Sequence, residues 1–394
     1  MRYTILSSLL LAAQLVQSQP YEIPPPRPFP VYQPTAIPTT APVKIQAAIL
    51  LDVSNSMDGL IEQAKAQLWN MVSIMGRAQC GTGAPQFEIA LYEYGRTNND
   101  PAQGYVKQIS PFTTNLDRLS SLLFALNTYG GEEYCGQAIY TSLNELTWDN
   151  NPNSYKVIFI AGNESFQQGG VHFTKSCTLA KNKSVIVNTI YCGDRTQGIR
   201  EHWNLGAECG TGSFTFINSN ERVEEFPTPY DTMLFSLNDR LNNTYLAFGS
   251  EGRTRMAEQA SADQKNYAMN KSVMAKRVMV KGNKAMYKNE DWDLVEAAET
   301  KPELIAALPA DKLPESMKGK TRAEIAQEVK KRAAERKTIQ AKIDEVGKQR
   351  EAWIVTEKKR IATSRKNPTS ANTLETAVEN MIREQAGRYR MVIQ

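Results

Sequence analysis

Apolar segments of strand length alternate with helix-compatible segments between residues 43 and 248. Runs such as residues 157–160 and 185–187 are almost wholly apolar, which is typical of strands buried on both faces of a parallel sheet. The pattern predicts strands at residues 45–51, 87–94, 105–109, 156–160, 184–191 and 213–217, and helices at residues 57–78, 116–126, 134–146, 174–181, 199–206 and 229–246. The segment at residues 105–109 is polar enough to be an antiparallel edge strand. This alternation predicts an α/β fold with a doubly wound, mostly parallel sheet covered by helices on both faces.

The first of these strands ends in a cluster of oxygen donors. Asp52, Ser54 and Ser56 alternate along the chain, so their side chains point to one side if the turn stays extended. A parallel α/β sheet normally binds its ligand at this end of its strands. Hard oxygen donors suit a divalent cation, with Mg²⁺ preferred and Mn²⁺ or Ca²⁺ as alternatives. The competing interpretation is structural: either serine caps the following helix while Asp52 favours the positive end of that helix.

Two further features accompany this cluster. A Gly-Gly turn at Gly130-Gly131 precedes another helix, and the strand at residues 156–160 ends in a polar turn. With the Asp-x-Ser-x-Ser motif, they resemble the von Willebrand factor type A (VWA) domain, which has a Rossmann-like fold, over residues 43–248. The resemblance implies a metal-ion-dependent adhesion site (MIDAS), completed by a threonine and an aspartate from two other loops. It also implies a protein partner whose acidic side chain supplies the remaining ligand.

The loop expected to supply the threonine departs from the family pattern. Cys135 occupies the threonine position, and a neutral thiol is a poor ligand for a hard cation. Glu132 or Glu133 is an alternative oxygen donor, which makes both tentative metal ligands. The structural interpretation of these two residues is ordinary placement of acids near a helix N-terminus.

The loop expected to supply the aspartate is also altered. Gly162 falls on the aspartate position and Asn163 follows it, so Asn163 becomes a tentative ligand, directly or through water. An amide oxygen gives a weaker field than a carboxylate. The sequence therefore predicts a partly degenerate site with one intact arm and two altered ones, and a vestigial site is the alternative.

The N-terminal residues predict export. Residues 1–18 carry one Arg followed by an apolar run that is too short for a membrane span, which is typical of a signal peptide. No cysteine follows the expected cleavage point, so a lipid anchor is not indicated and we expect a secreted or periplasmic protein. Residues 19–42 are rich in proline and predict an extended linker.

The cysteines fit an oxidising compartment. All five lie within the α/β region, and their odd number leaves at least one without an intramolecular partner. Cys135, Cys177 and Cys192 fall near strand-end loops of the expected topology, which makes them the candidates for a disulfide.

From about residue 249 the composition changes. Residues 251–394 contain 30 Lys and Arg against 21 Asp and Glu, a net charge of +9, whereas the first 250 residues contain 16 against 21, a net charge of −5. This region, 249–394, predicts an all-α, partly coiled-coil part with a long charged helix at about residues 321–363. Arginines at positions 332, 336 and 350 interrupt its apolar seam, so a coiled-coil hairpin or a helix packed on its neighbours fits better than a regular two-stranded coil. With strings such as residues 160–164 and 187–193, nearly the whole mature chain resembles exported bacterial VWA proteins with a charged helical C-terminal region.

Motifs of the common enzyme classes are absent from the sequence. Only His172 and His202 are present, with no zinc-protease motif, no nucleophile elbow and no phosphate-binding loop. The basic helix interleaves its lysines with acids, which indicates a solvated face and no specific nucleic acid; an anionic envelope surface remains a candidate contact. The leading hypothesis is an exported, non-enzymatic module that binds a protein partner through a divalent cation. The alternative is a metal-independent envelope scaffold that acts through its helical tail.

Overall fold

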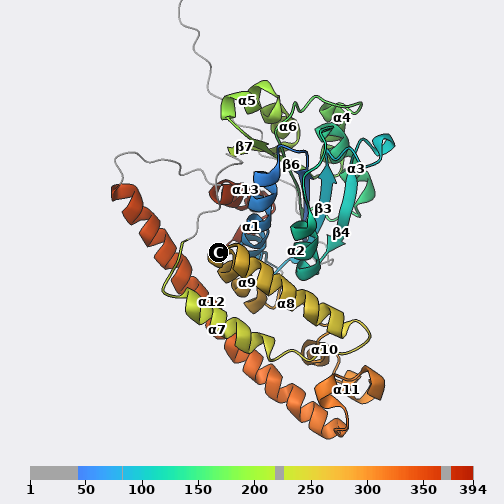
Figure 1. Ribbon diagram of the computed structural model, residues 1–394, viewed down its shortest axis with the longest axis vertical. Helices are drawn as coiled ribbons and strands as arrows, with labels where there is room; N and C mark the ends of the chain where they lie inside the picture. The colour runs from blue at the N-terminus through green and yellow to red at the C-terminus, as the bar shows by residue number, and fades with distance from the viewer. Residues whose placement is uncertain (1–42, 82, 218–225, 365–373, 394) are drawn as a thin grey trace, which may run out of the picture. The chain divides into compact units, whose positions relative to one another are not determined.

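A six-stranded sheet forms the centre of the computed structural model, which describes residues 43–81, 83–217, 226–364 and 374–393 (Figure 1). Its strands, in spatial order, are β4 (Lys107–Thr113), β3 (Gln86–Tyr94), β1 (Lys44–Asp52), β5 (Tyr155–Gly162), β6 (Ile186–Cys192) and β7 (Thr211–Ile217). Only β4 runs antiparallel to its neighbour. The predicted doubly wound, mostly parallel sheet is confirmed, including its polar edge strand. The predicted signal peptide (1–18) and linker (19–42) lie outside the described residues.

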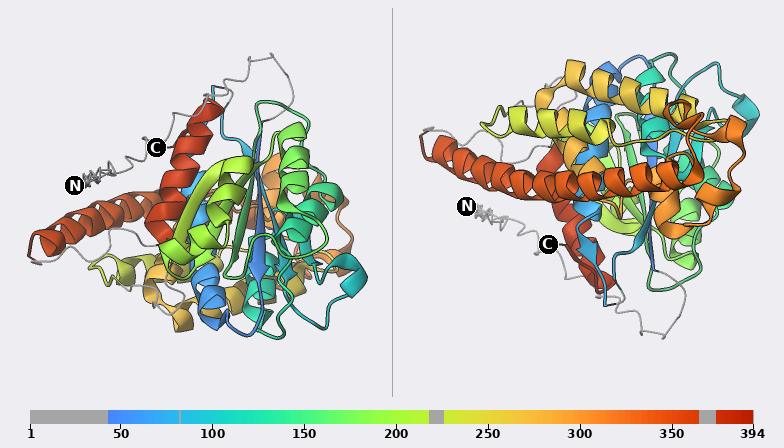
Figure 2. Two further views of the ribbon diagram at one scale, coloured as in Figure 1. Left: turned by 90° about the horizontal axis from the view of Figure 1, so that it is seen from above. Right: turned by 90° about the horizontal axis from the view of Figure 1, so that it is seen from below.

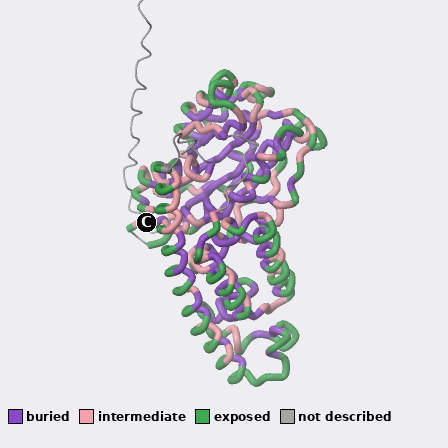
Figure 3. The backbone as a smooth tube through the Cα atoms, turned by 60° about the vertical axis from the view of Figure 1, so that its left-hand side comes forward, coloured by how far each residue is buried: buried purple, intermediate pink, exposed green. Residues whose placement is uncertain are grey.

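The central strands are buried on both faces, as their apolar sequences indicate (Figure 3). In β1, Ala47, Ile49 and Leu51 point into one hydrophobic core, whereas Ala48 and Leu50 point into a second core on the opposite face. The period-two alternation of side chains thus explains why a strand with two cores shows an unbroken apolar run.

Helices from the middle of the chain cover the second of these cores. They are α3 (Cys135–Glu145), α4 (Phe173–Asn182) and α6 (Trp203–Cys209), with α5 (Arg195–Arg200) beside α6. Aromatic side chains fill much of the space between them: the rings of Phe166 and Trp203 pack edge to face with centroids 4.9 Å apart.

The opposite face is covered by helices from both ends of the chain. α1 (Asp58–Met75) and α2 (Leu116–Ala125) share one core with α7 (Asp231–Asn242), α9 (Lys271–Gly282), α12 (Arg322–Ser364) and α13 (Leu374–Arg388). The predicted boundary at residue 248 is therefore not a boundary of the core, because side chains such as Trp69 and Val278 belong to the same cluster.

The last helix completes this layer beside α1 (Figure 2). α13 packs on α1 and β7, and its Gln385 is fully buried against the sheet. The Oε1 atom of Gln385 accepts a hydrogen bond from the Tyr155 hydroxyl at 2.9 Å, while its Nε2 donates to Asn188 Oδ1 at 2.7 Å. After α13 the chain ends its described part in β8 (Val392–Ile393), which pairs antiparallel with β2 (Ala78–Gln79).

A buried ion cluster links this helical layer to the α/β region. Arg277 of α9 is fully buried and donates to Asp117 of α2 and to Asp263 of α8 (Gly252–Met269), each at 2.7 Å. Lys281 also contacts Asp263 at 2.8 Å. Burial alone would raise the pKa of Asp263, but the charges of Lys281 and Arg277 outweigh burial and hold this pKa well below its usual range.

The long charged helix α12 lies within two residues of its predicted limits. It packs on α7, α9, α10 (Leu294–Thr300) and α11 (Leu304–Ala307), so it is a helix packed on several short neighbours rather than half of a coiled-coil hairpin. The arginines that interrupt its apolar seam explain this packing: Arg336 pairs with Asp293, and Arg350 pairs with Asp231 at 2.8 Å.

The remaining short elements are the 3₁₀ turns η1 (Pro101–Gln103), η2 (Ala310–Lys312) and η3 (Glu315–Met317). Within the described ranges, no helix has both the length and the hydropathy of a membrane-crossing segment.

Candidate metal site

The candidate site lies at the carboxyl end of β1, in the middle of the sheet. The loop after β1 is held on both sides by backbone hydrogen bonds: Val53 N donates to Tyr94 O at 2.9 Å, and Tyr129 N donates to Val53 O at 2.8 Å. Asn55 N donates to Gly130 O at 3.1 Å, which ties the loop to the Gly-Gly turn. The strand-end loop and the turn that the sequence singled out are thus direct neighbours.

The two serine hydroxyls converge in this loop. Ser54 Oγ and Ser56 Oγ lie 3.3 Å apart, and Ser56 Oγ lies 3.3 Å from Asn163 Nδ2 and 3.5 Å from Asn163 Oδ1. The capping alternative is wrong, because Met57 occupies the N-cap of α1 and makes no side-chain capping hydrogen bond. The hydroxyls bond to each other and to Asn163 instead of capping the helix.

Asp52, the last residue of β1, is fully buried. Its Oδ1 accepts a hydrogen bond from Ser54 N at 2.8 Å, but its Oδ2 has no hydrogen-bond partner among the described residues. Burial, with smaller contributions from the neighbouring charges of Glu133 and Glu164, raises the pKa of Asp52 to about 7. A buried carboxylate oxygen without a partner is costly, which makes it a place where a cation or a proton is expected.

Glu133 reaches the same place from the Gly-Gly turn. Its side chain is buried, and Gly95 shows how closely it approaches: a Cβ on Gly95 would lie 2.8 Å from Asp52 Oδ1 and 3.2 Å from Glu133 Cγ. Gly95 also has a φ of +88°, so both backbone and space require glycine here. Burial raises the pKa of Glu133, the charge of Glu164 adds to this rise, and a hydrogen bond with Ser54 opposes it.

The other tentative ligand of this loop, Glu132, is engaged elsewhere. Glu132 is half-buried, and its Oε2 accepts a hydrogen bond from the Tyr134 hydroxyl at 2.7 Å. Of the two acids in this loop, Glu133 is therefore the one adjacent to Asp52.

The structure explains the glycine at the family's aspartate position. A Cβ on Gly162 would lie 2.5 Å from the Tyr94 hydroxyl oxygen and 3.0 Å from Asp52 Oδ2, so no side chain fits there. The Tyr94 hydroxyl fills this space and donates to Ala161 O at 2.8 Å. Cys135 Sγ lies 3.7 Å from the same hydroxyl, and burial raises the pKa of the Cys135 thiol, which keeps it neutral and unsuited to a hard cation.

One residue that sequence reasoning missed belongs to this site. Tyr94 comes from the end of β3, and nothing in the local pattern of that strand marks its hydroxyl as functional. Glu164 directly follows Asn163, but its side chain is exposed, and its backbone oxygen accepts a hydrogen bond from Trp203 Nε1 at 2.7 Å.

The donor set fits a hard divalent cation. In octahedral coordination at 2.0–2.1 Å, adjacent oxygen ligands lie about 3 Å apart, close to the separation of the two serine hydroxyls. The carboxyl group of Asp52, whose Oδ2 has no hydrogen-bond partner among the described residues, would add a hard oxygen donor from the same loop. Within the described parts of the chain, no group of three or more His, Cys, Asp or Glu is placed to hold a metal, so hydroxyl oxygens would have to contribute.

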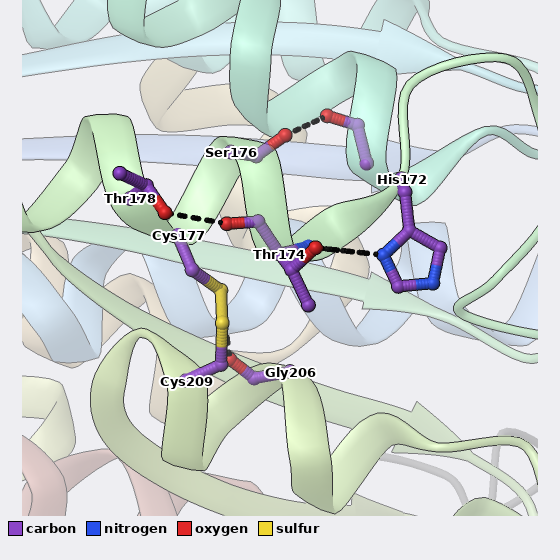
Figure 4. Close-up of a disulfide and its surroundings, with 8 residues drawn as sticks. His172, Thr174, Ser176, Cys177, Thr178, Gly206 and Cys209 are labelled. Atoms are coloured by element: carbon purple, nitrogen blue, oxygen red, sulfur yellow. Dashed lines mark hydrogen bonds between the residues drawn. A yellow bond between two sulfur atoms is a disulfide. The ribbon is translucent and has the colours of Figure 1, made fainter.

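The disulfide differs from the one expected. Cys177 of α4 pairs with Cys209 of α6, with their Cα atoms 5.6 Å apart (Figure 4). Cys135 and Cys192 are free and buried. A pairing among Cys135, Cys177 and Cys192 is therefore wrong. The packing of α4 on α6 brings Cys177 to Cys209, which lies at the end of a helix rather than in a strand-end loop.

Comparison with known proteins gave matches only among solved structures; no family model and no curated protein matches the chain. One match is an aerotolerance-related membrane protein from Bacteroides fragilis, with 15% identity and a TM-score of 0.32, covering 45% of this chain and 93% of that chain. A second is a von Willebrand factor type A protein from Catenulispora acidiphila, with 11% identity and a TM-score of 0.33, covering 45% and 39% respectively. A third is proximal thread matrix protein 1 from the mussel byssus with a zinc-occupied MIDAS motif, with 12% identity and a TM-score of 0.32, covering 46% and 43%. The matches thus include VWA domains, the family that the sequence resembles.

Proposed function

We propose that this protein is an exported, non-enzymatic binding module that captures a protein partner through a divalent cation at the carboxyl end of β1. The observation that carries the proposal is the fully buried Asp52, whose Oδ2 lacks a hydrogen-bond partner among the described residues, in the loop where the hydroxyls of Ser54 and Ser56 converge. Mg²⁺ is the preferred ion because the donors are hard oxygens, with Mn²⁺ and Ca²⁺ as alternatives.

The side chains have distinct roles in this proposal. Ser54 and Ser56 coordinate the ion directly through their hydroxyls, and Asn163, which contacts Ser56, holds that hydroxyl or adds its own amide oxygen. Asp52 acts through its charge or through a bound water, since its Oδ1 is already engaged by Ser54 N. The bound ion supplies the positive charge that the buried carboxylate lacks.

Export completes the proposal. A disulfide between Cys177 and Cys209 supports an oxidising compartment, since cytosolic thiols are kept reduced. The apolar N-terminal run of residues 1–18 would direct the chain there as a cleaved signal peptide. We therefore propose that the mature protein is secreted or periplasmic.

Isothermal titration calorimetry of the purified chain with MgCl₂, MnCl₂ and CaCl₂ tests the cation. We expect binding by the unchanged protein and loss of at least one order of magnitude in affinity for Asp52→Ala and for Ser56→Ala. Ser165→Ala, in the neighbouring strand-end loop, is the matched control and should bind normally, because the Ser165 hydroxyl accepts a local hydrogen bond from Gln167 N. Absence of binding, or equal binding by all variants, would refute the metal site.

The alternative is a metal-independent scaffold that acts through α12. Exposed lysines on this helix favour it, including Lys330, Lys331 and Lys337. Its prediction is partner capture that persists in EDTA and is lost in a variant with these three lysines changed to glutamine. Deleting the helical region cannot serve as this test, because α9 and α13 belong to the main core.

A further inference from the structure

A lysine is buried with two asparagines and an aspartate where α7, α8 and α9 meet. Lys281 of α9 is fully buried, and its Nζ lies 2.8 Å from Asn238 Oδ1 and 2.7 Å from Asn242 Oδ1, both on α7. The same Nζ lies 2.8 Å from Asp263 Oδ2 on α8. An amine and a side-chain amide are thus held in contact away from bulk water.

Asp263 contacts both the amine and the amide nitrogen of Asn238. Its Oδ2 atom accepts one hydrogen bond from Lys281 Nζ and another, at 2.9 Å, from Asn238 Nδ2. One carboxylate oxygen is therefore placed to take a proton from the amine and deliver it to the amide nitrogen. An ordinary buried ion pair needs only the contact between Lys281 and Asp263.

Burial favours the uncharged form of Lys281. It lowers the pKa of this lysine; the charge of Asp263 opposes the effect, and the charge of Arg277 adds to it. Arg277 Nε donates to Asp263 Oδ1 at 2.7 Å, so the carboxylate keeps a positive partner when the lysine loses its proton. An uncharged amine has the lone pair that attacks a carbonyl carbon, which makes Lys281 a candidate nucleophile.

We propose that Lys281 and Asn238 form an intramolecular amide bond that fastens α9 to α7. The Lys281 ammonium gives one proton to Asp263, and the resulting amine attacks Cγ of Asn238. The bond between Cγ and Nδ2 breaks as Asp263 returns that proton to Nδ2, and Nζ gives a second proton to the freed carboxylate. The departing ammonia takes the second proton away as ammonium, so the reaction consumes no oxidant, cofactor or water.

The folded chain supplies what this reaction needs. Lys281 and Arg277 hold the pKa of Asp263 well below its usual range, so the first proton transfer is uphill; a slow step is sufficient because each molecule reacts once. Contact between the two groups replaces a bimolecular encounter, which lowers the barrier. Asn238 is the partner because it is buried, whereas Asn242 is half-buried at the end of α7, where water competes for its carbonyl group.

The bond has a structural consequence. It joins residues that are 43 positions apart in the sequence, and the loop that it closes contains α8. A covalent link across such a loop restricts the unfolded chain, as a disulfide does. Unlike the disulfide between Cys177 and Cys209, it resists reducing agents.

Tryptic peptide mapping of the purified full chain by tandem mass spectrometry, after reduction of the disulfide, tests the inference. We expect a branched peptide that joins residues 223–240 to residues 278–284, because trypsin does not cleave after a modified Lys281. Its mass should be lower than the sum of the two linear peptides by one molecule of ammonia. Recovery of linear peptides alone would overturn the proposal and leave an ordinary buried ion cluster.

The same map identifies the asparagine. Because trypsin cleaves after Arg240, Asn238 lies in the peptide of residues 223–240 and Asn242 in the peptide of residues 241–253. A branch to the second peptide would overturn the assignment to Asn238.

Three variants complete the test. Asn238→Ala and Asp263→Asn should each abolish the branched peptide, whereas the matched control Asn242→Ala should retain it. Persistence of the branch in Asn238→Ala, or its loss in Asn242→Ala, would contradict the assignment, and persistence in Asp263→Asn would refute the proton transfer. The unchanged chain decides whether the bond exists, so the test does not depend on the folding of any variant.

Discussion

Loss of α13 should unfold the sheet rather than merely shorten the tail. This helix covers the sheet beside α1 and buries several large apolar side chains in the main core. They are Leu374, Val378, Met381 and Ile382, together with Met391 just after the helix. Ending the chain at residue 364 would expose the sheet surface that these side chains now cover.

The expected magnitude follows from the burial. Each large apolar side chain contributes about 1.5–3 kcal/mol when fully buried, so the five together correspond to about 7–15 kcal/mol. A domain of ordinary stability has about 5–15 kcal/mol in total. The truncated chain should therefore lose cooperative unfolding, whereas the single change Ile382→Ala should cost about 2–5 kcal/mol because Ile382 is fully buried.

Urea unfolding followed by circular dichroism provides the measurement. Val392→Ala is the matched control for Ile382→Ala, because Val392 is 65% exposed and should change the free energy of unfolding by less than about 0.5 kcal/mol. A truncated chain that unfolds cooperatively at the same urea concentration as the full chain would refute the assignment of α13 to the core. Equal effects of the two point variants would refute it as well.

Three further perturbations address the ion cluster, the disulfide and the site. Arg277→Met should reduce the free energy of unfolding by about 3–5 kcal/mol, because it leaves Asp117 and Asp263 buried without their shared partner; a loss below about 1 kcal/mol in urea unfolding would contradict this. Cys177→Ser should cost about 3–4 kcal/mol from the 32-residue separation of the disulfide cysteines, and reducing agent should then have no further effect on thermal unfolding. The pKa of Asp52 is raised to about 7 in the folded chain, so the folded state binds a proton that the unfolded state has lost between about pH 4 and pH 7. In EDTA, stability should therefore fall as pH rises through this window, and Asp52→Asn should flatten the profile; an unchanged slope in that variant would exclude Asp52 as the cause.

The α/β architecture could be predicted because its signals are local. Strands buried on both faces must be apolar at nearly every position, and β1 and β5 are. The convergence of side chains in the Asp-x-Ser-x-Ser turn could be predicted for the same reason, because its three polar residues lie within five positions of one another. The length of α12 was also readable, because helix-forming residues continue without a break to Asn367-Pro368.

The packing of the C-terminal helices, their ion pairs and the disulfide could not be predicted, because they depend on which distant segments meet. No local pattern in residues 374–388 shows that Gln385 will bond Tyr155 and Asn188, or that this helix belongs to the same core as residues 45–91. Arg336 and Arg350 look like interruptions of an apolar seam until Asp293 and Asp231 are found beside them. The disulfide partner of Cys177 likewise follows from the packing of α4 on α6.

By itself, then, the sequence determined the sheet, the helical tail and the oxygen cluster at the end of the first strand, because periodicity and spacing act over a few residues. Tertiary structure alone decided which acidic side chains meet there. Gly95 allows Glu133 to approach Asp52, and the Tyr94 hydroxyl fills the space beside Gly162. Electrostatic interactions depend on distance in space, and these two carboxyl groups come from different segments, 81 positions apart in the sequence.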